Sequence, residues 1–368
     1  MPSETAFWLG LSRLPGLSAR RALWLQQAFG SGSAVWKASA GDLQSVLNLE
    51  ADRLDSLLTR RQQLDPEALL TRVERAGGWV ISIQDADYPE QLRELFDPPI
   101  VIYGLGSRLQ FGRPRVAIVG ARRMTSYGKQ VVERFMADLA PAQPVVISGL
   151  ARGVDGQSHR SALEHGLTTW AVLGSGLGRI YPPEHKQLAL QLVNSGGTVL
   201  SEYWPDEEPM PYHFPARNRI IAALAGVVLV VEADEKSGSL ITVDHALDLG
   251  REVLAVPGNV TSRQSRGTNL LLRQGAGIAL SAQDILGVWG LSTEEQRTAS
   301  PVLQPVERQI YLALDDNPLS FDRLVQETGL AVADILAAIT TLELKGLVRT
   351  DNDQSYRREG RYEVQDSR

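Results

Sequence analysis

The chain has 368 residues, enough for two or three domains of about 150 residues each. Hydrophobic residues make up 43% of it and charged residues 22%, which excludes a wholly disordered or fibrous protein. Its 37 basic and 43 acidic side chains give a net charge of −6, which argues against a surface that coats nucleic acid over its whole extent. Cysteine is absent, which excludes disulfide bonds, thiolate metal sites and cysteine nucleophiles.

The charge is unevenly distributed along the chain. Residues 1–110 carry 11 basic and 13 acidic side chains, residues 111–290 carry 17 and 16, and residues 291–368 carry 9 and 14. The middle segment, at net +1, is therefore the only one that is not acidic. Of the basic residues 32 are Arg, an excess that codon usage explains for the most part, with phosphate recognition by the planar guanidinium group as the alternative.

Residues 1–78 predict a small helical domain, because apolar residues recur there at helical spacing between Gly and Ser breaks. The stretch LPGLSARRALWLQQAFG (14–30) is typical of the Pro-Gly turn of a helix-hairpin-helix unit, which binds phosphate through backbone N–H groups. Ser18 stands where such a turn usually has its second Gly. We therefore favour a structural role for this turn and keep DNA contact as the alternative.

Residues 79–290 predict an extended Rossmann-like α/β domain, because short apolar strands alternate with helical stretches. Such a pattern indicates a doubly wound, mostly parallel sheet with helices on both faces. The strands are expected at 79–83, 115–120, 144–149, 168–176, 198–202, 225–233, 252–258 and 277–281. Ligands of such sheets bind beyond the carboxyl ends of the strands.

An acidic linker at 291–303 is expected to lead into a winged-helix-like C-terminal domain at 304–368, with a polar tail. Its expected recognition helix, 332–345, carries Asp334, Glu343 and Lys345, for a net charge of −1. A helix that reads the major groove normally presents Arg, Lys, Asn or Gln to the base edges. We therefore predict that this module does not read duplex DNA by itself.

The loops that follow the strands of the sheet carry the most informative residues. Gly lets backbone N–H groups approach an anion closely, and helix starts add partial positive charge. The arginines in or beside these loops are Arg122, Arg123, Arg152, Arg179, Arg217 and Arg219. Several such loops along one edge predict a chain of phosphates. Tyr181 and Phe214 lie close to them in sequence, where they serve either base stacking or core packing.

Catalytic and cofactor signals are weak. The strand at 115–120 ends in Gly-Ala-Arg without a GxGxxG pattern, which disfavours an NAD site, and the five His residues lack metal-binding spacing. Asp155 and His159 are spaced to share a helix face, where stabilising the helix is the more frequent role. Glu232 and Asp234 are the carboxylates best placed for catalysis, but no partner is evident. We expect no cofactor.

Seven sequence blocks, in chain order, together resemble the DNA-processing protein A family, also called DprA or Smf. The blocks are IVGAR (118–122), SGLARGVDGQSH (148–159), GSGLGRIYP (174–182), FPARNRIIAAL (214–224), VVEADEKSGSLIT (230–242), VPGN (256–259) and GTNLLLRQGA (267–276). The resemblance implies a non-catalytic single-stranded DNA-binding protein that protects incoming strands in natural transformation. It also implies that the protein helps to load the RecA recombinase in the bacterial cytoplasm, usually as a homodimer.

By this match Arg122 would be a principal phosphate contact, and Phe214, Arg217, Asn218 and Arg219 would line the DNA pocket. The other contacts that the match implies come from Gly-rich loops and from neighbouring basic residues: Gly149, Arg152, Gly174, Ser175, Gly176, Lys186, Gly238 and Ser239.

Two positions depart from the family pattern. Ala121 stands where the family often has Ser, which removes one possible hydroxyl donor, and Pro183 stands where a basic residue often follows Tyr-Pro. Three consecutive leucines at 270–272 indicate a subunit contact, with simple burial as an equal alternative.

The alternative function is a Rossmann-like nucleotide-processing hydrolase that resembles the phosphoribohydrolases. The corresponding loop reads KSGSLIT (236–242) and lacks the Gly-Gly-x-Gly-Thr pattern and the Glu of those enzymes. A membrane span is not expected, because the longest apolar run, 220–231, has 12 residues, and the start of the chain shows no signal-peptide pattern.

Overall fold

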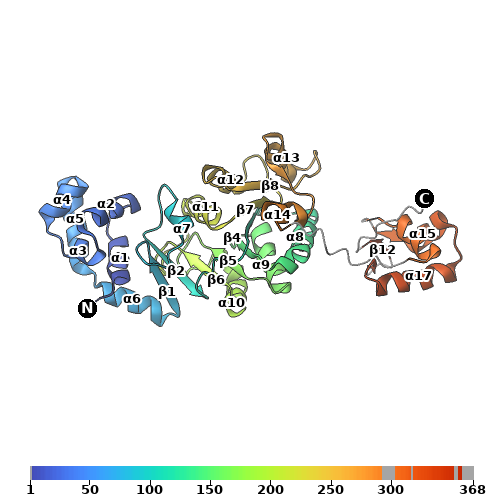
Figure 1. Ribbon diagram of the computed structural model, residues 1–368, viewed down its shortest axis with the longest axis horizontal. Coiled ribbons are helices and arrows are strands. Elements are labelled where there is room, and N and C mark those ends of the chain that lie inside the picture. Colours follow the sequence, from blue (N-terminus) through green and yellow to red (C-terminus); the bar gives the residue numbers. More distant parts are fainter. Residues whose placement is uncertain (1, 292–302, 316–317, 352–354, 359–368) are drawn as a thin grey trace. The chain divides into compact units, whose positions relative to one another are not determined.

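The computed structural model describes residues 2–291, 303–315, 318–351 and 355–358 (Figure 1). The chain divides into two compact units, Met1–Ser292 and Thr293–Arg368. Nearly all of the linker expected at 291–303, and the polar tail, lie outside the described residues. The expected boundary between residues 78 and 79 falls inside the first unit and stays a prediction.

The first unit begins with short helices. They are α1 (Glu4–Ser12), α2 (Ala19–Phe29), α3 (Gly32–Lys37), α4 (Ala40–Leu47), α5 (Ala51–Gln63) and α6 (Pro66–Arg75). Ser18 is the N-cap of α2, and its side chain accepts a hydrogen bond from the backbone N–H of Arg21. This capping role explains why a serine stands at this position. The helices share one apolar core with the neighbouring strands, in which Trp8 and Leu25 join Tyr103. That shared core holds the helices and the sheet in one unit.

The sheet is doubly wound and mostly parallel, as the sequence predicts. Its strands are β1 (Gly78–Ser82), β2 (Val101–Gly106), β3 (Arg115–Val119), β4 (Val145–Ser148), β5 (Thr169–Val172), β6 (Thr198–Ser201), β7 (Val227–Val230), β8 (Glu252–Ala255) and β9 (Gly277–Ile278). They lie in the order β1-β2-β6-β5-β4-β3-β7-β8-β9. Strands β3 to β9 pair in parallel, whereas β2 runs antiparallel to both β1 and β6.

Strand β2 was not among the expected strands. Its apolar run is short and lies between Pro99 and Gly104, a pattern that does not distinguish a strand from a loop. The backbone pairing of Tyr103 with Ser201 and of Ile102 with Ile81 makes it a strand. This strand links the central sheet to β1 and, through the shared core, to the N-terminal helices.

Helices cover the sheet, as expected for a parallel sheet buried on both faces (Figure 1). They are α7 (Glu90–Arg93), α8 (Ser126–Leu139), α9 (Val154–Glu164), α10 (Lys186–Asn194), α11 (His213–Leu224), α12 (Ser239–Asp248), α13 (Arg266–Arg273) and α14 (Ala282–Val288). Short 3-10 turns are η1 (Ala140–Ala142), η2 (Pro183–His185) and η3 (Arg263–Ser265).

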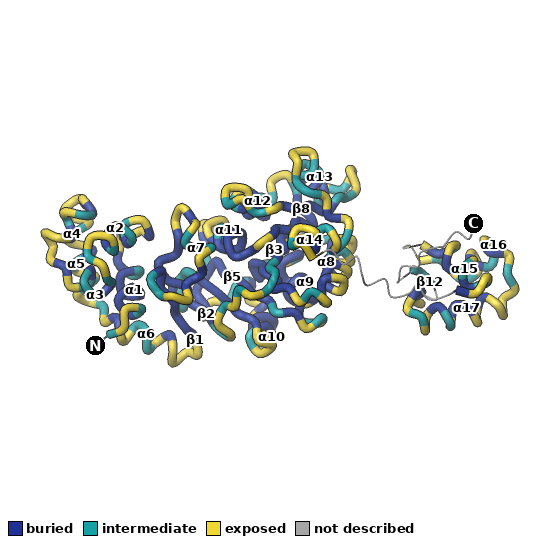
Figure 2. The backbone as a smooth tube through the Cα atoms, viewed as in Figure 1, coloured by how far each residue is buried: buried dark blue, intermediate teal, exposed yellow. Residues whose placement is uncertain are grey.

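Strand β3 shows how the sheet is packed between two helical layers. Val116 and Ile118 belong to the core cluster that contains Phe135 of α8. Ala117 and Val119 belong to the opposite cluster with the residues of α11 and α12. Figure 2 shows the resulting continuous burial of the central strands. Alternate side chains of each strand therefore face different helices, which leaves the carboxyl ends of the strands as the place for a ligand.

The order of the strands reverses at β3. From β3 the chain moves to β4, β5 and β6 on one side, and it then returns to place β7 on the other side of β3. The crevice beyond the carboxyl ends of β3 and β7 is the switch point at which doubly wound sheets bind ligands. The loop that starts at Gly120 and the loop that follows β7 flank this crevice.

The second unit is a winged-helix domain, as the sequence predicts. Its elements are α15 (Pro305–Ala313), β10 (Leu319–Ser320), α16 (Phe321–Thr328), α17 (Val332–Leu344), β11 (Val348–Thr350) and β12 (Ser355–Arg358). The strands pair in the order β10-β12-β11. Ile310, Leu324, Ile335 and Leu342 form the centre of its core. Gly329 ends α16 with a φ of 65°, in the left-handed region that suits glycine.

Across the described residues, no single helix has the length and apolar character needed to cross a membrane. One pair of consecutive helices, α16 and α17, meets the length and composition requirement when taken together, with a bend of 111° at the break.

Candidate nucleic-acid interface

An arginine and two aromatic rings meet at the carboxyl edge of the sheet. Arg122 is exposed in the loop after β3, and its Cζ lies 5.6 Å from the centroid of the Phe214 ring. Phe214 lies in the first turn of α11, and its centroid is 5.4 Å from that of Tyr181, at an interplanar angle of 52°. We call Arg122, which is exposed, and Tyr181 and Phe214, which are half-buried, the exposed cluster. A cation and aromatic faces placed together suit the phosphate and the base of an unpaired nucleotide.

Arg122 is also available electrostatically. It forms no ion pair with any carboxylate that the structure describes, and its described neighbour is the Phe214 ring. Arg152 differs, because its Nε donates to Glu184, and both side chains are about half exposed. Lys186 is exposed at the first residue of α10. Arg122 and Lys186 are therefore exposed cations of this edge for which the structure describes no ion pair, whereas Arg152 is paired.

The Gly-Ser-Gly loop after β5 positions the exposed cluster. A Cβ at Gly174 would lie 2.8 Å from Cδ1 of Phe214, so glycine makes room for the ring. The hydroxyl of Ser175 donates to the carbonyl of Arg179 at 2.7 Å, and the N–H of Gly176 donates to the carbonyl of Glu207 at 2.9 Å. These two donors therefore bond to groups within the fold. The sequence suggested that they contact an anion, whereas in the structure the loop makes room for the Phe214 ring.

Beneath the exposed cluster lie four buried polar side chains, Asp155, His159, His185 and Arg217, which we call the buried layer. Arg217 donates to the carbonyl of Gly149 at 2.8 Å and to that of Val172, and so ties the end of β4 to the end of β5. Burial lowers the pKa of Arg217 to about 10. A Cβ at Gly149 would collide with this guanidinium group. Arg217 therefore supports the loops from inside.

Asp155 holds the loop between β4 and α9. Its Oδ2 accepts hydrogen bonds from the N–H groups of Gly149 at 3.1 Å and of Ala151 at 3.4 Å. Burial raises the pKa of Asp155, and the nearby charge of Arg217 opposes that rise. The expected pair of Asp155 and His159 on one helix face thus serves the fold, each residue through a partner outside α9.

The two buried histidines support the strands and loops around them. Thr169 donates to the carbonyl of Val146 and accepts from Nδ1–H of His159 at 2.7 Å, which leaves Nε2 buried with no partner among the described residues. Burial lowers the pKa of His159 to about 3, and the neighbouring His185 and Arg217 contribute further. His185 donates from Nδ1 to the carbonyl of Leu150 at 2.8 Å and accepts from Arg160 at Nε2.

The other expected site residues lie deeper or to one side. Arg219 forms a two-pronged pair with Glu202, with both N–O distances at 2.6 Å, and its side chain is 12% exposed. Asn218 donates from Nδ2 to the carbonyl of Gly238 at 3.1 Å and so fixes the start of α12. Gly238 is exposed there, whereas Ser239 is buried and lies 2.8 Å from the hydroxyl of Ser237.

The carboxylates that the sequence placed best for catalysis are also engaged. Glu232 accepts from the backbone N–H of Thr125 at 2.9 Å and from its hydroxyl, and so caps the start of α8. Asp234 pairs with Arg263 at 2.6 Å. The described residues hold no cluster of three or more His, Asp or Glu side chains suited to a metal ion. Both carboxylates at this edge thus have partners within the fold.

Comparison with known proteins agrees with this geometry. Residues 79–290 match the family described as DNA recombination-mediator protein A, and residues 294–354 match the DprA winged helix domain. The first match alone covers more than half of the chain. The chain belongs to the DprA/Smf family of DNA recombination mediators.

Relatives match this DprA-family chain in sequence and in structure. Protein Smf of Synechocystis sp. is 32% identical over 97% of this chain and 99% of its own length. The DNA processing protein DprA of Streptococcus pneumoniae is 42% identical over 56% of this chain and 72% of its own. The crystal structure of the S. pneumoniae DprA superimposes with a TM-score of 0.69 at 34% identity, over 78% of this chain and 98% of that one.

A second solved structure is that of DNA processing protein A from Helicobacter pylori, described for its single-stranded DNA binding mode. It superimposes with a TM-score of 0.51 at 32% identity, over 57% of this chain and 95% of that chain.

The sequence of this DprA-family chain did not indicate which carboxylates pair with its arginines. Glu184 and Glu202 neutralise Arg152 and Arg219 from positions 32 and 17 residues away. Tyr181 belongs to the exposed cluster although it was expected only as a neighbour of the loops. The cue for Tyr181 was its place directly after the Gly-rich loop, whereas nothing in the sequence indicated that Arg217 is buried.

Proposed function

We propose that this DprA-family mediator binds single-stranded DNA at the exposed cluster, without catalysing a reaction. The observation that carries the proposal is Arg122, an exposed guanidinium group without a described ion pair that lies over the Phe214 ring at the carboxyl edge of the sheet. Arg122 would bind a phosphate, and the faces of Phe214 and Tyr181 would stack on bases. Lys186 and Arg152 would add charge at the rim of the same edge.

The contact set differs from the one that family resemblance implies. Arg217, Asn218, Gly149, Ser175 and Gly176 would act on DNA indirectly, because their polar groups hold the loops in place. Arg219 would contact a phosphate only if DNA displaced Glu202, with which it pairs closely. Gly238 and Ser239, at the start of α12, would border the crevice from the side of β7.

The biological role that fits this binding is the one implied by the family. The protein would cover incoming single strands in natural transformation and help to load RecA on them, in the bacterial cytoplasm. As a homodimer it would use the edge of the sheet near β9, where Ile278 and Leu280 are 55% and 68% exposed and α13 carries the three leucines. Sedimentation at micromolar concentration tests the dimer, and monomer alone would contradict it.

One experiment tests the binding proposal. Affinity for labelled oligo-dT and for duplex is measured across a salt series, with mononucleotide hydrolysis followed in parallel. We expect tight oligo-dT binding that weakens as salt rises, because phosphates bound by the protein release counterions. Arg122→Ala should weaken it at least tenfold, whereas Arg134→Ala, an equal change of charge on the body of α8, should not.

The outcome that contradicts the proposal is equally specific. If Arg122→Ala binds oligo-dT as the parent chain does while nucleotide turnover is measurable, the edge is an enzymatic site of the phosphoribohydrolase type. The addition of RecA to oligo-dT already covered by this protein then tests the loading role. Faster filament formation than on naked oligo-dT in competition with duplex is the expected result.

A further inference from the structure

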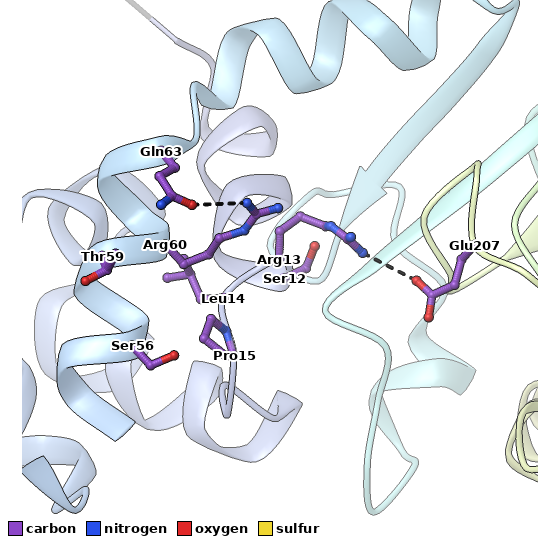
Figure 3. A pocket seen from close by; sticks show the side chains of 9 residues that line it. All are labelled: Ser12, Arg13, Leu14, Pro15, Ser56, Thr59, Arg60, Gln63 and Glu207. Atoms are coloured by element: carbon purple, nitrogen blue, oxygen red, sulfur yellow. Dashed lines mark hydrogen bonds and ion pairs between the residues drawn. The ribbon is translucent and has the colours of Figure 1, made fainter. Parts of the chain in front are cut away.

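A basic hollow, separate from the exposed cluster, lies between the N-terminal helices and the sheet. It has a volume of about 600 Å³ and is formed by the end of α1, the turn that follows it, one face of α5, and the loop between β6 and α11 (Figure 3). Ser56, Thr59, Arg60 and Gln63 share that face of α5, since they are spaced at i, i+3, i+4 and i+7. The hollow contains no part of the exposed cluster.

The charges that line the hollow favour an anion. Arg13 and Arg60 supply two guanidinium groups, and Glu207 supplies the only carboxylate among the lining residues. Arg60 has Gln63 as its polar partner, at 3.4 Å between Nη1 and Oε1. Hydroxyl and amide groups from α1 and α5 surround these charges. Arginine forks of this kind match the oxygens of a phosphate group.

The ion pair inside the hollow is weak enough to open. Nη1 of Arg13 and Oε2 of Glu207 are 3.5 Å apart, and the side chains are 29% and 36% exposed. Figure 3 shows Arg13 reaching across the hollow toward Glu207. Pairs as exposed as this contribute little to stability, so a phosphate can replace the carboxylate at small cost. Arg13 also lies over the Trp204 ring, at 5.2 Å, which holds its position when Glu207 moves.

Glu207 connects the hollow to the elements that hold Phe214. The carbonyl of Glu207 accepts from the N–H of Gly176, in the loop that packs against Phe214. Its carboxylate lies 3.7 Å from Nε2 of His213, the first residue of α11 and the neighbour of Phe214. The loop that carries Glu207 therefore contacts both the hollow and the elements that hold Phe214.

We infer that Arg13 and Arg60 form a second phosphate-binding site, which takes the backbone of the same DNA strand beyond the exposed cluster, and that Glu207 occupies this site when DNA is absent. The inference rests on the proposed function. Phosphate on a free nucleotide has the same chemistry, so the source of the phosphate must be distinguished by experiment.

The test measures the affinity of the full chain for oligo-dT of two lengths, about 6 and about 20 nucleotides, since a single-strand groove spans roughly 4–16 nucleotides. Arg60→Ala should weaken binding of the long oligonucleotide about fivefold and lower the salt slope by about 0.7 per lost phosphate contact, with little effect on the short one. Glu207→Gln should strengthen binding of the long oligonucleotide, because it removes the competing charge.

The control is Arg75→Ala, which removes an equal charge from α6 outside the hollow. Equal affinities of the Arg60→Ala and Arg75→Ala variants for the long oligonucleotide would overturn the inference. Binding of dTMP or inorganic phosphate that depends on Arg60, with no dependence on oligonucleotide length, would also overturn it, because the site would then take a free phosphate. Arg122→Ala is measured on the same oligonucleotides: if it too has no effect, the proposed function itself fails.

Discussion

The exposed cluster and the buried layer lie at the same edge of one sheet, and each contains an arginine that serves a different purpose. In the exposed cluster Arg122 faces solvent over an aromatic ring, with no described carboxylate beside it. In the buried layer Arg217 is 4% exposed, and its guanidinium group donates hydrogen bonds to carbonyls at the ends of two strands. The difference teaches that a basic residue after a strand is available to a ligand only where the loops leave its side chain exposed to solvent.

Arg217→Ala should produce the largest change in stability. Its removal leaves Asp155 as a buried charge without its cation, and it leaves two buried carbonyls without a donor. We expect a loss of about 3–5 kcal/mol in the free energy of unfolding, measured by urea denaturation. Arg122→Ala is the control, because a solvent-exposed change away from such contacts stays within about 0.5 kcal/mol. Equal losses for both variants would abolish the contrast between the two regions.

Phe214→Leu should affect binding and leave folding largely intact. Leucine keeps the apolar volume but removes the ring that lies between Arg122 and Tyr181. We expect oligo-dT binding to weaken by roughly 1–3 kcal/mol, as measured by fluorescence anisotropy. Tyr181→Phe, which keeps the ring and removes the hydroxyl, should bind as the parent chain does. Unchanged affinity for Phe214→Leu would show that the ring is there for packing alone.

His159 should make the buried layer sensitive to acid. Its pKa is lowered to about 3 in the fold, against about 6.5 when unfolded, so the folded state resists protonation. The stability that this neutral histidine supports is fully present above pH 6.5 and is lost as the pH falls toward 3. By pH 5 the loss attributable to His159 is about 2 kcal/mol.

The measurement compares urea denaturation at pH 7 and pH 5 for the parent chain and for His159→Asn. The asparagine side chain can still bond Thr169 but does not titrate, so its stability should fall less between the two pH values. If both chains lose the same stability, the acid sensitivity comes from other groups.

The smallest effect is expected in the winged-helix unit. The outer face of α17 presents Val332, Leu336 and Leu344, which are 51%, 48% and 86% exposed, together with the acidic Asp334. Asp334→Lys reverses a charge on that face, and we expect it to change duplex affinity by less than about twofold, measured by anisotropy. A large gain in affinity would mean that this helix already lies along duplex DNA. That result would contradict the prediction that the winged-helix unit does not read duplex DNA by itself.

Much of this arrangement could be predicted from the sequence. Alternating apolar strands and helical stretches predicted the doubly wound sheet, and helix stops such as Gly329 helped to outline the winged helix. The loop after β3 singled out Arg122, and the aromatic neighbours of the loops were Tyr181 and Phe214. These features are local, because they depend on residue type and on spacing along the chain.

Other features depended on contacts between distant segments. Strand β2 exists because β1 and β6 pair with it, and no periodic pattern in its own sequence indicated that. Arg152 and Arg219 are neutralised by Glu184 and Glu202, which reach them through the folding of separate loops. The basic hollow requires α1, α5 and the loop that carries Glu207 to meet.

By itself, the sequence determined the family and the class of fold, and it predicted the edge of the sheet at which we propose that DNA binds, because short motifs and apolar periodicity carry that information. The tertiary structure alone decided which arginines at that edge are free. Whether a guanidinium group is solvated or buried depends on the carboxylates and carbonyls that the fold brings within about 3 Å of it, and residues far apart in the sequence supply those partners.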